Sequence, residues 1–289
     1  MIANRITALI LMSLALTVVS CSLTDSSAPS PIFLDIPSVG IATDADQGAA
    51  THKFTDVWVT ADGVNLGVYP LPASVPIVVD GKETVDVSLF PGIRNNGVKS
   101  SAFIYSLMQP ESYTIDVEVG ATTTLTPTFR YKDEAKFDFV ESFEGTDIFT
   151  FTGISHLGAD IESTNSTAAS GQRSGRILLN SVNTTAEIGT NVSYSGADNG
   201  GSDSYLEFDY KNDIPIFAGI YVTDNGVLRR VYDAVVTEQD DWNKIYIDFT
   251  LALASPTVTD YRVMFLTTVD GTGRSSGEVF IDNVKFVHF

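Results

Sequence analysis

The chain has 289 residues, 44% of them hydrophobic, and its 36 acidic and 17 basic side chains give a formal net charge of −19. This length and apolar content suit one large or two ordinary folded domains, so the chain as a whole is not disordered. The acidity argues against nucleic acid and anionic lipid surfaces as partners, because both require a basic face.

The first 20 residues have the layout of an export signal. One charge, Arg5, precedes an uncharged run from Ile6 to Val19, and the small residue Ser20 precedes the only cysteine, Cys21. The tetrapeptide Val18-Val19-Ser20-Cys21 resembles the lipobox of bacterial lipoproteins, whose cysteine is acylated, for example with palmitate. The resemblance implies a lipid anchor at Cys21. A plain secretory signal and a membrane-spanning anchor are the alternatives, but the run is shorter than the ~20 residues of a spanning helix.

Residues 21–50 predict a flexible tether between this anchor and the folded part. The segment is rich in Ser, Asp, Pro and Ala, lacks periodicity and has little apolar surface to bury. A short apolar island from Ile32 to Ile36 leaves open that the part around Phe33 packs onto the first domain.

Ser22, rather than an acidic residue, follows the cysteine, which favours the bacterial outer membrane as the location of the protein. The sequence leaves open which side of that membrane the protein faces.

Residues 51–131 predict a small, immunoglobulin-like β-sandwich. Runs with a period of two alternate with turn sequences such as Asp62-Gly63, a pattern typical of antiparallel sandwiches. In the first run, Val57 and Val59 share one face and Asp56, Trp58 and Thr60 the other. The predicted strands are Phe54 to Thr60, Pro76 to Val79, Thr84 to Phe90, Ser101 to Met108, Tyr113 to Val119 and Thr123 to Tyr131.

Residues 137–289 predict a second, larger β-domain, because no window shows apolar residues at helical spacing. Asp224-Asn225-Gly226 is the clearest hairpin turn in the chain. The predicted strands are Phe137 to Phe143, Ile148 to Thr152, Gly175 to Asn180, Glu187 to Tyr194, Tyr205 to Tyr210, Phe217 to Thr223, Leu228 to Val235, Trp242 to Leu253, Tyr261 to Thr267 and Glu278 to Phe289.

Several segments of this domain follow one another in a familiar order. They are Phe143-Glu144, Ser174-Gly-Arg-Ile-Leu-Leu179, Tyr205-Leu-Glu-Phe-Asp-Tyr210, Asp241-Trp-Asn-Lys244 and the final Gly277-Glu-Val-Phe-Ile-Asp282-Asn-Val-Lys-Phe286. Their order over about 150 residues resembles the jelly-roll domains that serve as carbohydrate-binding modules in bacterial polysaccharide degradation. The resemblance implies an all-β jelly-roll fold. Sugar binding follows from it less strictly, because jelly rolls host unrelated functions.

The same resemblance implies a structural calcium ion that ties the first strand of the domain to the last. Glu144 and Asp282 would be its side-chain ligands, helped by backbone carbonyls and Asp147, since calcium takes six to eight oxygen ligands. The alternative interpretation is a surface glutamate and an aspartate that caps a turn.

A sugar site in such a module needs aromatic rings that stack on pyranose faces. The candidate ligand-binding residues are Trp58, Trp242, Tyr205, Tyr221 and Tyr232. Trp58 fits an exposed position and burial between the domains equally well, whereas packing at the sandwich edge is the favoured interpretation of Trp242. Arg229 and Arg230, just after the hairpin turn, would either orient a ligand or balance nearby acids, and the second is favoured.

Few residues suggest catalysis. The three histidines (His52, His156 and His288) stand apart and have no partner at a zinc-binding spacing. The chain has no Gly-x-Ser-x-Gly nucleophile motif and no phosphate-binding glycine loop. Acidic residues are too numerous to single out a glycosidase pair. We therefore expect no enzyme and no organic cofactor.

Three functions stay open, in decreasing order of support. The first is a membrane-anchored, non-catalytic lipoprotein that binds a polysaccharide through the jelly roll. The second is an accessory or structural subunit of an outer-membrane protein complex, and the third is a glycoside hydrolase-like enzyme. Aromatic residues gathered on one exposed surface favour the first, apolar surface for protein contacts the second, and two carboxylates about 5–10 Å apart in a cleft the third.

Overall fold

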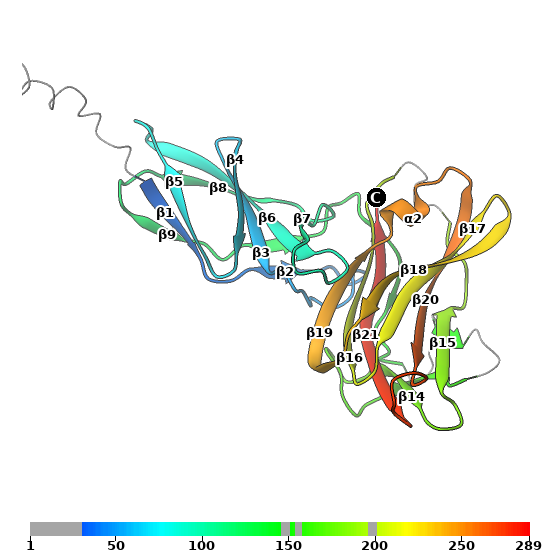
Figure 1. Cartoon of the computed structure of the whole chain (residues 1–289). Helices are drawn as coiled ribbons and strands as arrows, with labels where there is room; N and C mark the ends of the chain where they lie inside the picture. Colours follow the sequence, from blue (N-terminus) through cyan, green and yellow to red (C-terminus); the bar gives the residue numbers. More distant parts are fainter. Residues whose placement is uncertain (1–30, 146–150, 154–157, 196–200) are drawn as a thin grey trace, which may run out of the picture.

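The computed structural model describes residues 31–145, 151–153, 158–195 and 201–289, and strands form nearly all of its regular structure (Figure 1). The one helix in these ranges, α2 (Thr250–Leu253), is a single turn. Across the same ranges, no helix has the length and apolar character needed to cross a membrane. The predicted all-β fold is confirmed, and the strands form two units, one up to β10 and one from β11 onward.

The N-terminal unit is a small sandwich. An antiparallel sheet of order β4-β3-β6-β7, with β8 beside β6, packs against a sheet of order β5-β1-β9, while β2 and β10 form a parallel pair. Their shared core includes the fully buried Leu34, Val57 and Val87. The strands are β1 (Pro31–Ile36), β2 (Gly40–Ala42), β3 (Asp56–Ala61), β4 (Val64–Pro70), β5 (Ala73–Val78), β6 (Thr84–Arg94), β7 (Ala102–Ile104), β8 (Glu111–Asp116), β9 (Thr122–Thr124) and β10 (Thr128–Arg130).

Residues 31–42 belong to this sandwich and not to a tether. Strand β1 pairs antiparallel with β5 and parallel with β9, and it buries Ile32, Leu34 and Ile36. The alternating island therefore gains enough burial to offset the entropy of ordering it. The prediction of a tether over 21–50 is wrong from residue 31 onward. Residues 31–42 pack onto the first domain, the alternative left open for them, and Gln47 accepts a hydrogen bond from Lys285 of the C-terminal unit. Residues 21–30, with Cys21, lie outside the described residues.

The C-terminal unit is a jelly-roll sandwich of two antiparallel sheets. The sheet of order β13-β14-β21-β16-β19, with β11 beside β21, is named the junction sheet, and the sheet of order β12-β15-β20-β17-β18 is named the outer sheet. Phe208, Phe265 and Phe286 are buried between them. The strands are β11 (Lys136–Glu141), β12 (Phe151–Gly153), β13 (Ile161–Thr164), β14 (Ser174–Leu179), β15 (Thr185–Thr190), β16 (Ser204–Asn212), β17 (Ile216–Asp224), β18 (Val227–Val236), β19 (Gln239–Asp248), β20 (Val258–Thr268) and β21 (Gly277–His288).

Two local sequences end strands in different ways. Asn225 and Gly226 form the predicted two-residue turn between β17 and β18, with positive φ angles of 51° and 74°. The strand predicted from Trp242 to Leu253 stops early, at Asp248, and α2 follows. Asp248 Oδ1 accepts the N–H of Thr250 at 2.9 Å, a local side-chain bond that competes with strand extension. The predicted strand from Ile148 lies outside the described residues as far as residue 150.

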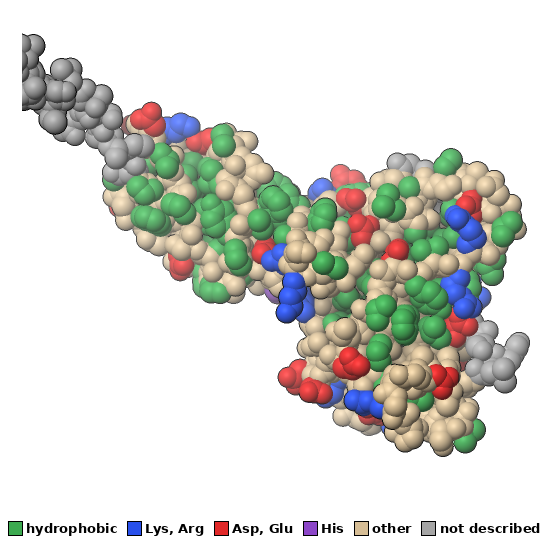
Figure 2. Space-filling view, in the orientation of Figure 1, with side chains coloured by type: hydrophobic (Ala, Val, Ile, Leu, Met, Phe, Trp, Pro, Cys, Tyr) green, Lys and Arg blue, Asp and Glu red, His purple; other side chains and the backbone are tan. Residues whose placement is uncertain are grey.

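The N-terminal unit covers the part of the junction sheet that β16, β19 and β21 form. The N-terminal hydrophobic core continues into Tyr205, Tyr246 and Val287 of the C-terminal unit. The rings of Tyr105 and Tyr246 lie 5.1 Å apart across the boundary. As a result both faces of β16 are covered, and every residue from Ser204 to Tyr210 is buried. The units thus meet along a packed junction, visible as the waist of the molecule in Figure 2.

Candidate functional site

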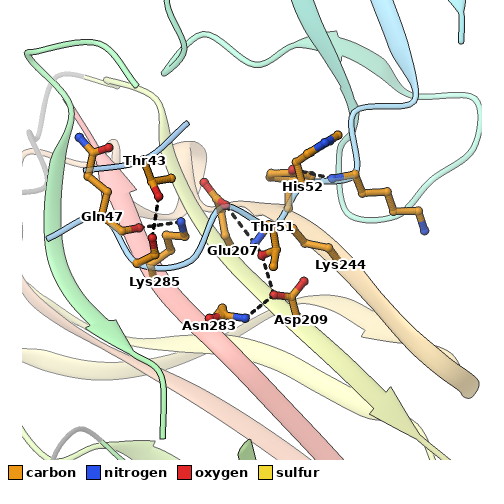
Figure 3. A network of polar contacts seen from close by, with 12 residues as sticks. Thr43, Gln47, Thr51, His52, Glu207, Asp209, Lys244, Asn283 and Lys285 are labelled. Carbon is orange, nitrogen blue, oxygen red and sulfur yellow. Dashed lines mark hydrogen bonds and ion pairs between the residues drawn. The ribbon is translucent and has the colours of Figure 1, made fainter. Parts of the chain in front are cut away.

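A buried polar network fills this junction (Figure 3). Glu207 and Lys285 are fully buried, and Lys244 and Asp209 are each 4% exposed. These side chains come from β16, β19 and β21, and the segment of the N-terminal unit that carries Thr43, Gln47, Thr51 and His52 crosses over them.

Glu207 is the centre of the network. Its Oε1 accepts hydrogen bonds from the hydroxyls of Tyr105 and Tyr131, each at 2.6 Å, and Lys244 Nζ lies 3.3 Å from its Oε2. Burial raises the pKa of Glu207, but Lys285, Lys244 and the two tyrosine hydroxyls outweigh it and hold the pKa below its ordinary value. Glu207 is therefore a carboxylate at neutral pH, held by donors from both units.

The other buried groups extend the network to the N-terminal segment. Lys285 Nζ donates to the backbone oxygen of Gln47 at 2.8 Å, and burial lowers the pKa of Lys285 to about 8. Asp209 Oδ2 accepts hydrogen bonds from Thr51 Oγ1 at 2.7 Å and Asn283 Nδ2 at 2.8 Å. Hydrogen bonds of this network therefore join the two units, and its burial keeps these groups from a ligand.

A second cluster lies on the solvent side of the outer sheet. Tyr221 and Arg230 are cross-strand neighbours on β17 and β18, and the guanidinium lies 5.0 Å from the Tyr221 ring and 6.0 Å from the Tyr232 ring. Arg230 also pairs with Glu187 at 2.7 Å, and Glu187 Oε1 accepts the Tyr221 hydroxyl at 2.8 Å. We name these four side chains the tyrosine–arginine cluster. Both rings are only partly buried.

Gly219 lets this cluster pack closely onto the sheet. A Cβ at this position would lie 2.9 Å from both Tyr232 Cδ1 and Met264 Cε, and 2.3 Å from the backbone oxygen of Val231. The missing side chain makes room for the Tyr232 ring above the strand. The sheet therefore offers partly exposed aromatic rings beside a planar cation and a carboxylate.

The predicted ligand-binding residues do not form one surface. Tyr221 and Tyr232 come together in the tyrosine–arginine cluster. The prediction is wrong for Tyr205, which is 4% exposed because the N-terminal unit covers it, and which packs edge-on against Tyr105 at 5.1 Å. Trp242 is half-buried: its Nε1 donates to Thr167 Oγ1 at 2.9 Å and its ring lies 6.4 Å from Phe280.

Trp58 lies on the N-terminal unit, apart from these tyrosines. It is half-buried on β3 and pairs across the sheet with Val68 and Phe90. Val57 and Val59 share the opposite face, as predicted, and both are fully buried. No hydrogen-bond partner for its buried Nε1 is found among the described residues. Its place on a sheet of the other unit separates it from the tyrosine–arginine cluster.

The two predicted calcium ligands hold the same loop. Glu144 Oε1 accepts the N–H groups of Gln172 and Arg173 at 2.8 and 3.2 Å. Asp282 is fully buried, and its Oδ2 accepts the N–H groups of Ala169 and Ser170 at 3.0 and 3.2 Å. A cation would have to share these oxygens with backbone donors, and within the described ranges no three Asp, Glu, His or Cys side chains form a metal-binding group. The calcium ion stays a prediction; Asp147 and His156 lie outside the described residues.

Three acidic side chains line a shallow cleft of about 240 Å³, namely Asp213, Asp240 and Glu278. Asp213 pairs with Arg274 at 3.3 Å, and Glu278 pairs with Arg176 at 2.6 Å. Asp213 Oδ1 also accepts the backbone N–H of Glu278 at 2.6 Å. These contacts engage two of the three carboxylates in ion pairs at the end of the sandwich.

Comparison with known proteins finds solved structures that resemble this chain, but no sequence family. No family model matches the chain, and no curated protein does. Among solved structures, the C-terminal family 22 carbohydrate-binding module of Clostridium thermocellum Xyn10B is 15% identical, with a TM-score of 0.42 over 54% of this chain and 97% of that chain. The tandem CBM22-1–CBM22-2 domain of Paenibacillus barcinonensis Xyn10C is 14% identical, with a TM-score of 0.42 over 84% and 76%.

A phage protein is similar as well. The enzymatically active domain of tailspike protein 4 of bacteriophage CBA120 is 14% identical, with a TM-score of 0.40 over 58% of this chain and 26% of that chain. With TM-scores below 0.5, we draw no conclusion about ligand or activity from these similarities.

Proposed function

We propose that the protein is a non-catalytic, membrane-anchored lipoprotein that binds a glycan on the outer sheet of its jelly roll. The observation that carries the proposal is the tyrosine–arginine cluster, in which two partly exposed rings flank Arg230. Ring faces offer apolar surface on which a pyranose stacks. Glu187 and Arg230 supply planar hydrogen-bonding groups for sugar hydroxyls.

The proposal of a non-catalytic role is supported by the chemistry of the clefts. The larger cleft between the units, of about 650 Å³, has no acidic side chain in its lining. In the cleft of about 240 Å³, arginines engage Asp213 and Glu278. A glycosidase needs one carboxyl group free to act as an acid and another free to act as a base or nucleophile.

Calorimetric titration and affinity electrophoresis against neutral plant and algal polysaccharides test the glycan site. Tyr221→Ala and Tyr232→Ala should each weaken binding by about tenfold, since each removes a stacking face and its apolar contact area. Phe103→Ala, which changes a 50% exposed ring on the N-terminal unit, is the matched control and should bind normally. Wild-type protein that binds none of these glycans, or tyrosine variants that match the control, would contradict the proposal.

The anchor has a separate test. We propose that Cys21 is acylated, on the strength of its lipobox-like surroundings. Cys21→Ala should release the protein from the membrane fraction or leave it unprocessed, whereas Ser22→Ala should fractionate as wild type. Unchanged membrane association of Cys21→Ala would refute acylation as the anchor.

A second candidate, an accessory subunit of an outer-membrane complex, is favoured by the edges of the N-terminal sheet. Edge strand β4 exposes Val64 (62%) and Val68 (38%), and edge strand β7 exposes Phe103 (50%) and Ile104 (39%). Apolar side chains on unpaired edges suit pairing with another protein. Cross-linking in intact cells should then recover a partner from these edges, and recovery of lipid alone would count against it.

A further inference from the structure

A cleft of about 650 Å³ opens between the two units beside the buried network. The turn after β6 forms one wall and β19 forms the other. Asn96 fixes this turn to β19, because its N–H donates to the backbone oxygen of Tyr246 at 2.9 Å and its Oδ1 accepts the N–H of Asp248 at 2.9 Å. The turn therefore holds Gly97 and Lys99 at the cleft. The volume of the cleft lies within the range typical of ligand pockets.

The lining of this cleft is basic. It contains no Asp or Glu, and its charged side chains are Lys53, Arg94, Lys99 and Lys244. Arg94 is neutralised by the buried Asp56 at 2.7 Å. Lys244 is neutralised by Glu207 at 3.3 Å. In the part of the chain that the structure describes, Lys53 and Lys99 have no ion-pair partner, and Lys53 Nζ donates to the neutral Asn243 Oδ1 at 2.5 Å.

Among the described residues, the cleft therefore carries two lysines without an ion-pair partner, in a chain whose acids outnumber its bases by 36 to 17. Burial and the charge of Lys99 both lower the pKa of Lys53, so the two ammonium groups repel each other across the cleft. Figure 2 shows basic side chains at the junction between the units, with acidic side chains near them. An anion bound between Lys53 and Lys99 would relieve this repulsion, whereas the acidic remainder of the surface repels anions.

The neutral part of the lining indicates what kind of anion fits. Its polar side chains are uncharged hydrogen-bonding groups that suit hydroxyls, namely Thr55, Thr237, Gln239 and Asn243. The two tyrosines of the lining, Tyr210 and Tyr246, are 5% and 2% exposed, so neither offers a free ring face on which a nucleobase could stack. Hydroxyl-rich anions therefore match the cleft better than nucleotides do.

We propose that the cleft between Lys53 and Lys99 binds the charged group of an acidic saccharide, either a carboxylate or a sulfate ester. The proposal rests on the glycan-binding function proposed above, but it uses a different sheet and different residues. An acidic polysaccharide would then contact the protein at two places, the cleft and the tyrosine–arginine cluster. The two sites can be tested separately.

The test uses the full mature protein and three probes: polygalacturonate, a sulfated galactan and a neutral galactan. Lys53→Gln and Lys99→Gln should each weaken binding to an acidic probe by about tenfold, the typical value of one charge-assisted hydrogen bond. Lys82→Gln removes an equal charge from a lysine that is paired with Asp62 at the surface, and it should bind as wild type. Added salt should weaken acidic-probe binding of the wild type more than that of the two lysine variants.

Each outcome decides between the two proposals. Preference for polygalacturonate or for the sulfated galactan identifies carboxylate or sulfate as the charged group. Equal affinity for acidic and neutral probes, or Lys53→Gln and Lys99→Gln variants that match Lys82→Gln, overturns the cleft. Loss of neutral-galactan binding in Tyr221→Ala with retained lysine dependence supports both sites, whereas lysine-dependent binding unaffected by Tyr221→Ala supports the cleft and refutes the outer sheet. Circular dichroism melts confirm that these exposed-site variants fold.

Discussion

Replacing Glu207 by glutamine should destabilise the protein by about 3–5 kcal/mol, the typical cost of breaking a buried ion pair. The substitution keeps the side chain's size but removes the acidic partner that Lys244 has among the described residues. It also takes away one of the two negative charges, with Asp209 the other, that oppose the effect of burial on the pKa of Lys285. The hydroxyls of Tyr105 and Tyr131, which donate to Glu207 Oε1 at 2.6 Å, can donate to the amide oxygen of glutamine instead. These hydrogen bonds are weaker, because the acceptor is no longer charged.

Urea unfolding followed by circular dichroism measures this loss. Glu118→Gln, a change at an exposed acid of the N-terminal unit, is the control and should fall within about 0.5 kcal/mol of wild type. Without Glu207 the pKa of Lys285 should fall below its value of about 8, so the loss should be smaller above that pH, where Lys285 is neutral in both proteins. A loss below about 1 kcal/mol, or one that grows with pH, would refute the role of the Glu207 charge.

Three further changes test other parts of the structure. Burial raises the pKa of Asp282 to about 7, above the value of 3.8 for the unfolded chain. The protonated carboxyl group therefore contributes its full stabilisation below pH 3.8, and this stabilisation is lost as the pH rises through about 7. In thermal melts, the cost of Asp282→Asn should therefore shrink over that range, and a constant cost would contradict it. Gly219→Ala should cost about 1–3 kcal/mol in urea unfolding, because its Cβ meets Val231 O and Tyr232; an unchanged midpoint would exclude this close packing. If calcium binds, its addition should raise the melting temperature and EDTA should lower it, and Glu144→Gln should remove both effects. A melting temperature that neither calcium nor EDTA changes would refute the predicted calcium site.

Alternation and turn chemistry determine most of the secondary structure from sequence. The Asn225-Gly226 turn and the inward-facing Val57 and Val59 lie where local rules place them, because a strand's two-residue period and a turn's positive φ depend on nearest neighbours. The same rules miss the strand Pro31–Ile36, whose partners β5 and β9 lie about 40 and 90 residues away in the sequence. They also miss the end of β19, which a side-chain bond of Asp248 decides.

The same local rules predict only part of the candidate site. Tyr221 and Tyr232 are candidate ligand-binding residues from the sequence, but their approach to Glu187 depends on the pairing of four strands, β15, β20, β17 and β18. The two-residue period of the predicted strand places Tyr205, Glu207 and Asp209 on one face. That face is polar but buried, because a second unit covers it and supplies Tyr105, Tyr131 and Thr51 as partners.

The sequence by itself therefore determined the all-β class, the jelly-roll resemblance and the acidic character of the chain, because each is set by local pattern or composition. The tertiary structure decided which polar residues are buried, which aromatics are accessible and where Lys53 and Lys99 stay unpaired in a cleft. Burial and charge compensation are properties of contacts between distant segments, and the period of a strand specifies which residues share a face but not what covers it.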